Sequence, residues 1–138
     1  MDGVFPNGVS RMSRRALLVE DEDAIRAIAQ LSLERVGGWT VVCAASGEEA
    51  VEAVREDGAF DVVLLDVMMP GLDGPATLRR LRDGPLASAV PVIFLTAKAA
   101  AADRERLRAI GAAGVIAKPF DPMTLPGELE RILEPQGE

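Results

Sequence analysis

The chain has 138 residues, of which 49% are apolar, and this is enough for one domain with one shared core. Its net charge of −7 argues against direct binding to nucleic acid, because neutralising phosphates requires clustered Lys and Arg. Histidine is absent and Cys43 is the only cysteine, which excludes an internal disulfide, a Cys/His zinc site and catalysis by Ser-His-Asp or Cys-His groups.

The sequence lacks the marks of export or of a membrane span. No apolar run approaches the roughly 18 residues that a span needs, and the first dozen residues have no basic start followed by an apolar stretch. We therefore expect a cytoplasmic protein that does not contact the membrane. Residues 1–13 are rich in Gly, Pro and Asn and are predicted to form a flexible tail, residues 14–134 one domain, and residues 135–138 a short C-terminal tail.

Five short apolar runs rich in Val, Ile and Leu are predicted to be buried strands. They cover residues 15–19, 39–44, 61–65, 90–95 and 114–117. A longer segment with helical spacing of its apolar residues follows each run. The first of these segments places Ile25, Ile28, Leu31, Leu33 and Val36 on its apolar positions.

Helix ends are marked by capping residues and by proline. Ser46 and Glu49 have the spacing of a capping box, and Gly74-Pro75 places a proline where a first helical turn tolerates one. Pro126 cannot donate a hydrogen bond to a preceding carbonyl, so the regular part of the last helix should begin near Leu125. Glycine, which enters the left-handed conformation cheaply, follows four predicted helices, at residues 37–38, 58, 84 and 111.

Strict alternation of buried strands and helices predicts an α/β fold. We expect a doubly wound, five-stranded parallel sheet covered by five helices, with right-handed crossovers. The flavodoxin-like strand order 2-1-3-4-5 is the expected arrangement. In such a sheet, ligands bind outside the carboxyl ends of the strands.

Polar side chains stand at the ends of four of the five predicted strands. Strand one runs into Glu20 and Asp21, strand three into Asp66, strand four into Thr96 and strand five into Lys118. With strand two at an edge, the other strands all contribute a polar group to one crevice. The sequence therefore predicts a site of three carboxylates, one hydroxyl and one ammonium.

Two plainer interpretations of these residues stay open. A carboxylate or hydroxyl after a strand can simply cap the following helix, and Lys118 can form a structural ion pair with Asp66. Capping suits any one residue, but it does not explain why Asp66 follows four apolar residues or why Lys118, a poor N-cap, precedes Pro119.

Three carboxylates at close range repel unless a cation joins them. Oxygen ligands that are few in number and completed by water are typical of Mg²⁺ rather than of zinc. Glu20, Asp21 and Asp66 are the predicted acidic ligands of a Mg²⁺ ion.

Four motifs together resemble the receiver domain of two-component response regulators, of the chemotaxis CheY-like type. The resemblance covers residues 14–134, and the order and spacing of the motifs are those of the family. The motifs are VEDE at 19–22, LLDVMMPGLDG at 64–74, FLTAK at 94–98 and AKPF at 117–120.

The resemblance implies a phosphorylated switch. Asp66 would accept a phosphoryl group from a phosphohistidine, Thr96 and Lys118 would then contact that group, and the backbone carbonyl of Met68 would complete the Mg²⁺ site. A carboxylate is a weak nucleophile, so such a site works by positioning and by neutralising charge. The protein would be no enzyme beyond promoting its own phosphorylation and dephosphorylation.

The resemblance also implies the partners. The phosphoryl donor would be a sensor histidine kinase or a phosphotransfer protein. The surface formed by helix four, strand five and helix five would meet a downstream protein, and phosphorylation can drive formation of a homodimer. The sequence leaves open whether the receiver acts alone or belongs to a longer regulator.

The sequence departs from the family pattern at one position. Receivers often carry Tyr or Phe three residues before the lysine, whereas here Val115 stands there and should pack as an ordinary strand residue. Met68 and Lys98 occupy positions that line the phosphoryl group in the family, and we expect them to shield it from water. Six arginines in two helical segments are interpreted as solvated faces: Arg79, Arg80, Arg82, Arg104, Arg106 and Arg108.

Two other functions are compatible with parts of the pattern. A magnesium-dependent phosphatase of the haloacid dehalogenase type also uses an aspartate after a strand, but it needs a second acid two residues later, where Met68 stands. A pseudo-receiver keeps the fold without being phosphorylated. Retention of all five site residues argues against the pseudo-receiver: Glu20, Asp21, Asp66, Thr96 and Lys118.

Overall fold

The computed structural model describes residues 14–134, and within that range five parallel strands form one sheet. The strand order is β2-β1-β3-β4-β5, which confirms the predicted topology. Each strand begins and ends within two residues of its predicted bounds. The strands are β1 (Arg15–Val19), β2 (Thr40–Ala44), β3 (Val62–Asp66), β4 (Val92–Thr96) and β5 (Gly114–Ala117). The predicted tails, residues 1–13 and 135–138, lie outside the described residues.

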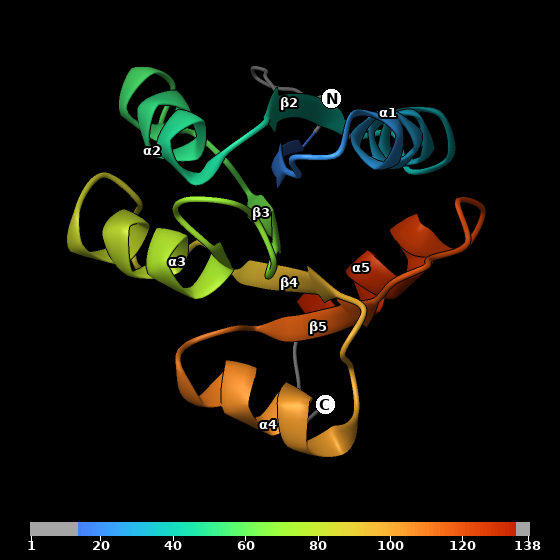
Figure 1. Ribbon diagram of the computed structural model, residues 1–138. Helices are drawn as coiled ribbons and strands as arrows, with labels where there is room; N and C mark the ends of the chain where they lie inside the picture. The colour runs from blue at the N-terminus through green and yellow to red at the C-terminus, as the bar shows by residue number, and fades with distance from the viewer. Residues whose placement is uncertain (1–13, 135–138) are drawn as a thin grey trace.

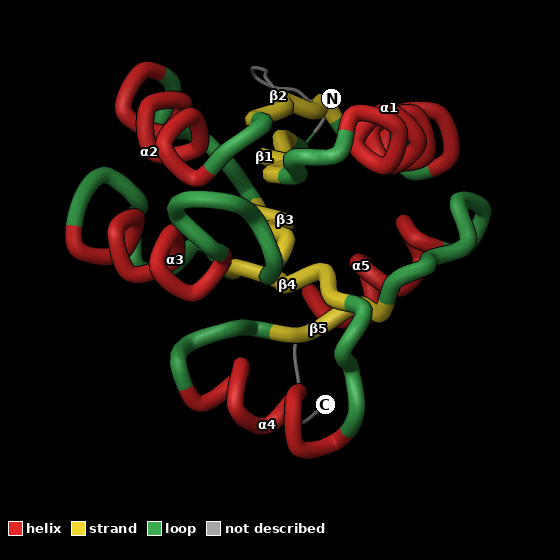
Figure 2. Tube along the Cα trace, viewed as in Figure 1, coloured by secondary structure: helices red, strands yellow, loops and turns green. Residues whose placement is uncertain are grey.

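Helices cover both faces of this sheet (Figures 1 and 2). α1 and α5 lie on one side, α2 and α3 on the other, and α4 lies beside β5 at the sheet edge. No helix within residues 14–134 has both the length and the apolar composition needed to cross a membrane. The helices are α1 (Asp23–Leu31), α2 (Gly47–Glu56), α3 (Gly74–Asp83), α4 (Ala101–Ala109) and α5 (Leu125–Leu133).

The central strands β3 and β4 are buried along their whole length because each face of the sheet has its own apolar core. Leu65 and Phe94 belong to a cluster that α2, α3 and α4 cover, whereas Leu64 and Leu95, one position away, belong to a cluster under α1 and α5. Side chains alternate between the faces of a strand, so continuous apolar runs are needed to fill both cores. This explains why β3 and β4 contain only apolar residues before Asp66 and Thr96 at their carboxyl ends.

The first helix differs from its prediction. After α1, the chain continues as a π-helical turn, η1 (Ser32–Val36). The helix buries Ala29 and Leu33 against the sheet, whereas Ile28 and Leu31 are exposed. Of the five predicted apolar positions, Leu33 is therefore buried, whereas Ile28, Leu31 and Val36 are exposed.

Most of the predicted helix ends are confirmed, and Gly38, Gly58 and Gly111 have the positive φ expected after a helix. The Ser46 hydroxyl accepts from the Glu49 N–H at 3.1 Å, but the Glu49 carboxylate accepts from Ala45 rather than from Ser46. The last helix begins at Leu125, as predicted. Gly84 has φ of −129° and does not adopt the left-handed conformation that we expected after α3.

Gly74, at the start of α3, is a glycine because the backbone at the carboxyl end of β3 passes very close to it. A Cβ at Gly74 would lie 2.5 Å from the Asp66 carbonyl oxygen and 2.8 Å from the Val67 Cα. Both are backbone atoms that cannot rotate away. Gly127 in α5 is the opposite case, because no atom lies within 4 Å of a Cβ placed there.

We expect Gly74→Ala to lower the free energy of unfolding by about 1–3 kcal/mol, because overpacking forces the backbone to shift. Gly127→Ala is the matched control and should raise it by about 0.5–1 kcal/mol, because alanine favours an exposed helix interior. Urea unfolding of both variants provides the measurement. Equal stabilities of Gly74→Ala and the parent would contradict the argument.

Candidate functional site

The parallel sheet brings the predicted polar residues to one edge. Glu20 and Asp21 follow β1, Asp66 ends β3, Thr96 ends β4, and Lys118 follows β5. β1 pairs with β3, β3 with β4, and β4 with β5, so all four strand ends are neighbours. The prediction that these residues share one crevice is consistent with this geometry.

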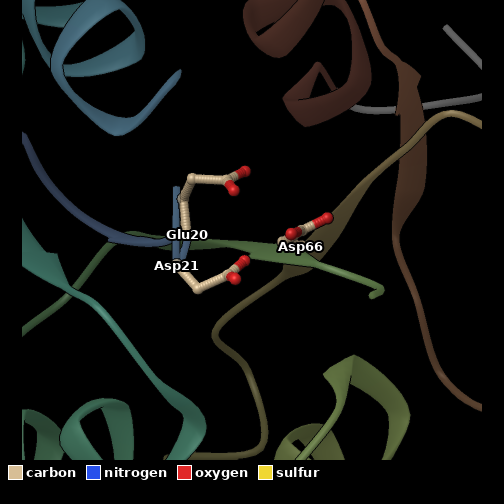
Figure 3. A group of neighbouring side chains, drawn as sticks. All are labelled: Glu20, Asp21 and Asp66. Carbon is tan, nitrogen blue, oxygen red and sulfur yellow. The ribbon is translucent and has the colours of Figure 1, made fainter. Parts of the chain in front are cut away.

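Three carboxylates form the centre of the site (Figure 3). One oxygen from each of Glu20, Asp21 and Asp66 lies within 4.8 Å of the other two. Glu20 is completely buried and Asp66 is 3% exposed, while Asp21 is half-buried. Two of the three negative charges are therefore removed from water, which is costly unless they are paired.

Lys118 supplies the pairing. Its ammonium donates to the Glu20 carboxylate at 3.0 Å and to the Asp66 carboxylate at 3.1 Å. The ion pair with Asp66 that the sequence left as an alternative is therefore present, and it includes Glu20 as well. The cluster has one ammonium and three carboxylates, so a further positive charge would be needed to balance it.

The shifted pKa values reflect this crowding. Burial, and then repulsion by Glu20, raise the pKa of Asp66 from 3.8 to about 6, and the hydrogen bond from Lys118 only partly offsets them. For Lys118, burial acts to lower the pKa, but the hydrogen bonds to Glu20 and Asp66 outweigh it, so the pKa is raised. Lys118 is therefore charged at neutral pH, and Asp66 is the carboxylate whose charged form the site disfavours.

Thr96 lies on the strand next to Asp66 and is 3% exposed. Its hydroxyl accepts a hydrogen bond from the Lys98 N–H at 3.0 Å, which ties it to the loop between β4 and α4. The Thr96 carbonyl accepts from the Lys118 N–H at 2.8 Å, so the backbones of the two residues are joined. Thr96 thus connects the polar edge with the following loop.

The turn after β1 is held by a residue that sequence analysis did not identify. Arg26 donates to the Glu20 carbonyl at 2.8 Å and to the Asp23 carboxylate at 2.6 Å. The Glu20 carboxylate also accepts from the Glu22 N–H at 3.2 Å. The three-residue spacing of Asp23 and Arg26 could have indicated the ion pair, but no pattern marks a backbone carbonyl as an acceptor.

Met68 follows Asp66 and Lys98 follows Thr96 by two residues, whereas Val115 belongs to the core. Met68 and Lys98 are both exposed, with Met68 at 71%. Val115 is 4% exposed and packs in the core as an ordinary strand residue, as predicted.

The interpretation of the arginines was wrong at two positions. Arg82 donates to the carbonyls of Ala87 and Val90, and Arg104 donates to the carbonyls of Ala99 and Val115. Both side chains are half-buried tethers rather than solvated charges.

The raised pKa of Asp66 predicts how stability depends on pH without divalent ions. Between pH 3.8 and about 6 the folded protein binds more protons than the unfolded chain, so the free energy of unfolding falls as pH rises through this window. Asp66→Asn removes the free-energy cost of ionising this buried carboxyl group. The variant should therefore be about 1–3 kcal/mol more stable than the parent at pH 7, with a smaller difference at pH 4. Urea unfolding across this range measures it.

The control for that experiment is Asp83→Asn, which removes an exposed carboxylate at the end of α3. A difference between Asp66→Asn and the parent that stays constant with pH would contradict the assignment of the strain to Asp66.

Comparison with known proteins identifies the same family. Residues 16–130 match the response regulator receiver domain. The transcriptional regulatory protein CseB of Streptomyces coelicolor is 43% identical over 117 residues, which cover 85% of this chain and 48% of CseB. The alkaline phosphatase synthesis transcriptional regulatory protein PhoP of Bacillus subtilis is 35% identical over 88% of this chain and 49% of its own length. The chain thus spans about half the length of these curated relatives.

Solved structures with the same fold include proteins of similar length. The chemotaxis response regulator CheY4 of Vibrio cholerae has 32% identity and a TM-score of 0.79, covering 88% of this chain and all of CheY4. The receiver domain of the hybrid histidine kinase CckA has 38% identity and a TM-score of 0.68, covering 87% and 99% of the two chains. The five-stranded fold, the family match and these relatives agree, and the chain belongs to the response regulator receiver domain family.

Proposed function

We propose that Asp66 accepts a phosphoryl group from a phosphohistidine on a sensor histidine kinase or a phosphotransfer protein. The observation that carries the proposal is that Lys118 bonds both Glu20 and Asp66 where three carboxylates lie within 4.8 Å of one another. This combination presents a buried carboxylate oxygen beside a fixed positive charge. Such a site suits phosphoryl transfer, in which positioning and charge neutralisation supply most of the catalysis.

The donor set fits Mg²⁺. Glu20, Asp21 and Asp66 offer only oxygen ligands, and the cluster carries more negative charge than Lys118 balances. Together with the backbone carbonyl of Met68, these residues would hold the ion. When bound, Mg²⁺ neutralises charge on the phosphoryl oxygens.

The residues of the chain then have separate roles. An Asp66 carboxylate oxygen forms the bond to phosphorus while the bond from phosphorus to the donor imidazole breaks, and the imidazole keeps the electron pair. Lys118 pairs with one oxygen of the transferred group. The Thr96 hydroxyl, which now accepts from Lys98, donates to another oxygen.

Phosphorylation would be read through α4, β5 and α5. The phosphoryl group adds about −1.5 to −2 charges and new acceptor oxygens beside Thr96 and Lys118. Movement of these two residues would change the surface that meets a downstream protein or a second copy of the chain. The proposed role requires no turnover of an external substrate.

The relatives suggest two settings for this receiver. CseB and PhoP are transcriptional regulatory proteins about twice as long as the matched region, whereas CheY4 is matched over its whole length. In both settings the receiver would act through protein contacts, in the cytoplasm where sensor kinases carry their phosphohistidine.

The first test is incubation with Mg²⁺ and acetyl phosphate, followed by intact mass. We expect the mass to increase by one phosphoryl group in the parent, and by none in Asp66→Asn or when a chelator removes Mg²⁺. Asp21→Asn should require a higher Mg²⁺ concentration, because one ligand charge is lost. Asp83→Asn is the control and should be phosphorylated like the parent.

Other outcomes of this experiment favour the alternative functions. No increase in mass with acetyl phosphate or with a phosphorylated kinase would indicate a pseudo-receiver. Continuous hydrolysis of a generic phosphate ester would indicate a phosphatase.

A second test concerns the lifetime of the phosphoryl group. Met68 and Lys98 are exposed beside the site, and we expect both side chains to hinder the approach of water. Met68→Ala and Lys98→Ala should each shorten the half-life of the phosphorylated protein several-fold. The measurement is the loss of the added mass after the donor is removed, and unchanged half-lives would refute the shielding role.

A further inference from the structure

Helix α4 is held to the domain by few apolar contacts. Its one buried residue among those described is Leu107, whereas α2 buries Gly47, Ala50, Val51 and Val54. Burial of apolar surface is what fixes most helices on a sheet. The position of α4 must therefore depend more on polar contacts than that of α2.

Arg104 provides those polar contacts. Its Nε donates to the Ala99 carbonyl at 2.7 Å, and its Nη1 donates to the Val115 carbonyl at 3.0 Å. Ala99 belongs to the loop between β4 and α4, and Val115 lies in β5. One half-buried guanidinium thus joins the loop, the helix and the strand, and its planar fork suits two acceptors at once.

The loop end of this bridge lies close to Thr96. The Lys98 N–H donates to the Thr96 hydroxyl, and Ala99 is the next residue. The Thr96 hydroxyl is thus hydrogen-bonded to Lys98, the covalent backbone continues to Ala99, and Arg104 joins the Ala99 carbonyl to that of Val115. Only one residue separates Thr96 from Lys98, so little slack exists in this connection.

The strand end of the bridge lies at the edge of the sheet. β5 is an edge strand, and the groove between it, α4 and α5 has a volume of about 870 Å³. Arg104 lines this groove with Arg108, Phe120 and Arg131. The guanidinium also covers the outward-facing Val115 carbonyl, which would otherwise be an open acceptor on the edge.

We propose that Arg104 is a positioning residue that couples Thr96 to β5 and to the groove between α4 and α5. The proposal rests on the function proposed for Asp66. In the unphosphorylated protein the bridge holds the loop and α4 in place. When the Thr96 hydroxyl turns to the phosphoryl group, the Lys98 N–H loses its acceptor and the Ala99 carbonyl shifts. Arg104, which donates to that carbonyl, must then change its position, and this alters the groove. This route replaces an aromatic side chain at position 115.

The test compares Arg104→Met, Arg104→Lys and the control Arg108→Met, which removes an exposed arginine from the same helix and groove. The first measurement is hydrogen exchange of backbone amides 97–103 and 114–117 in the unphosphorylated protein. Arg104→Met should raise exchange about tenfold in both segments, because two charged hydrogen bonds to the backbone are lost. Arg104→Lys keeps the charge but cannot bridge both carbonyls, so its exchange should lie in between.

The second measurement is the rate of phosphorylation by acetyl phosphate, which Arg104→Met should increase several-fold because the loop is no longer held in the unphosphorylated arrangement. Exchange or phosphorylation in Arg104→Met that matches Arg108→Met would overturn the coupling, as would complete rescue of both by Arg104→Lys. Thermal unfolding of each variant confirms that it is folded. If no variant takes a phosphoryl group, the proposed function fails, but the exchange result still decides whether Arg104 positions the loop.

Discussion

Repulsion among Glu20, Asp21 and Asp66 is the constraint around which this domain is arranged, and the ammonium of Lys118 offsets part of it by pairing with Glu20 and Asp66. The parallel sheet brings these charged side chains together, because the carboxyl ends of β1, β3 and β5 lie at one edge. The backbone near Asp66 is also tightly packed against Gly74, so Asp66 has little freedom to withdraw. The domain therefore retains a strained carboxylate, with its pKa raised to about 6, which a divalent cation or a covalent group would relieve.

Much of this arrangement could be predicted from the sequence, because the relevant patterns are long or repeated. Continuous apolar runs give buried strands, alternation with helices gives a parallel sheet, and the ends of parallel strands converge. Those three steps are enough to predict that Glu20, Asp66 and Lys118 meet at one edge of the sheet. The roles of these residues depend on the resemblance to receivers, and they remain proposals.

The failures have a common physical origin, since they concern features that are not encoded by side-chain type. In α1 the small Ala29 is buried, whereas the larger Ile28 and Leu31 are exposed. Arg82 and Arg104 were taken for solvated charges because their acceptors are backbone carbonyls, which every residue has. A sequence shows which groups can donate, but it does not show which carbonyls a fold leaves open.

Backbone carbonyls that a fold leaves open can serve a receiver that has valine at position 115. An aromatic reporter works through side-chain volume, so it requires a particular residue type. A hydrogen-bonded bridge to the Val115 carbonyl requires only that the strand present its backbone to α4, and the side chain is then free to serve the core, where Val115 lies. Such a bridge depends on both distance and direction, so a small movement of the loop breaks it. Because Leu107 is the one described residue of α4 that is buried in a core, the helix can respond to the loss of a few polar contacts with little change in apolar packing.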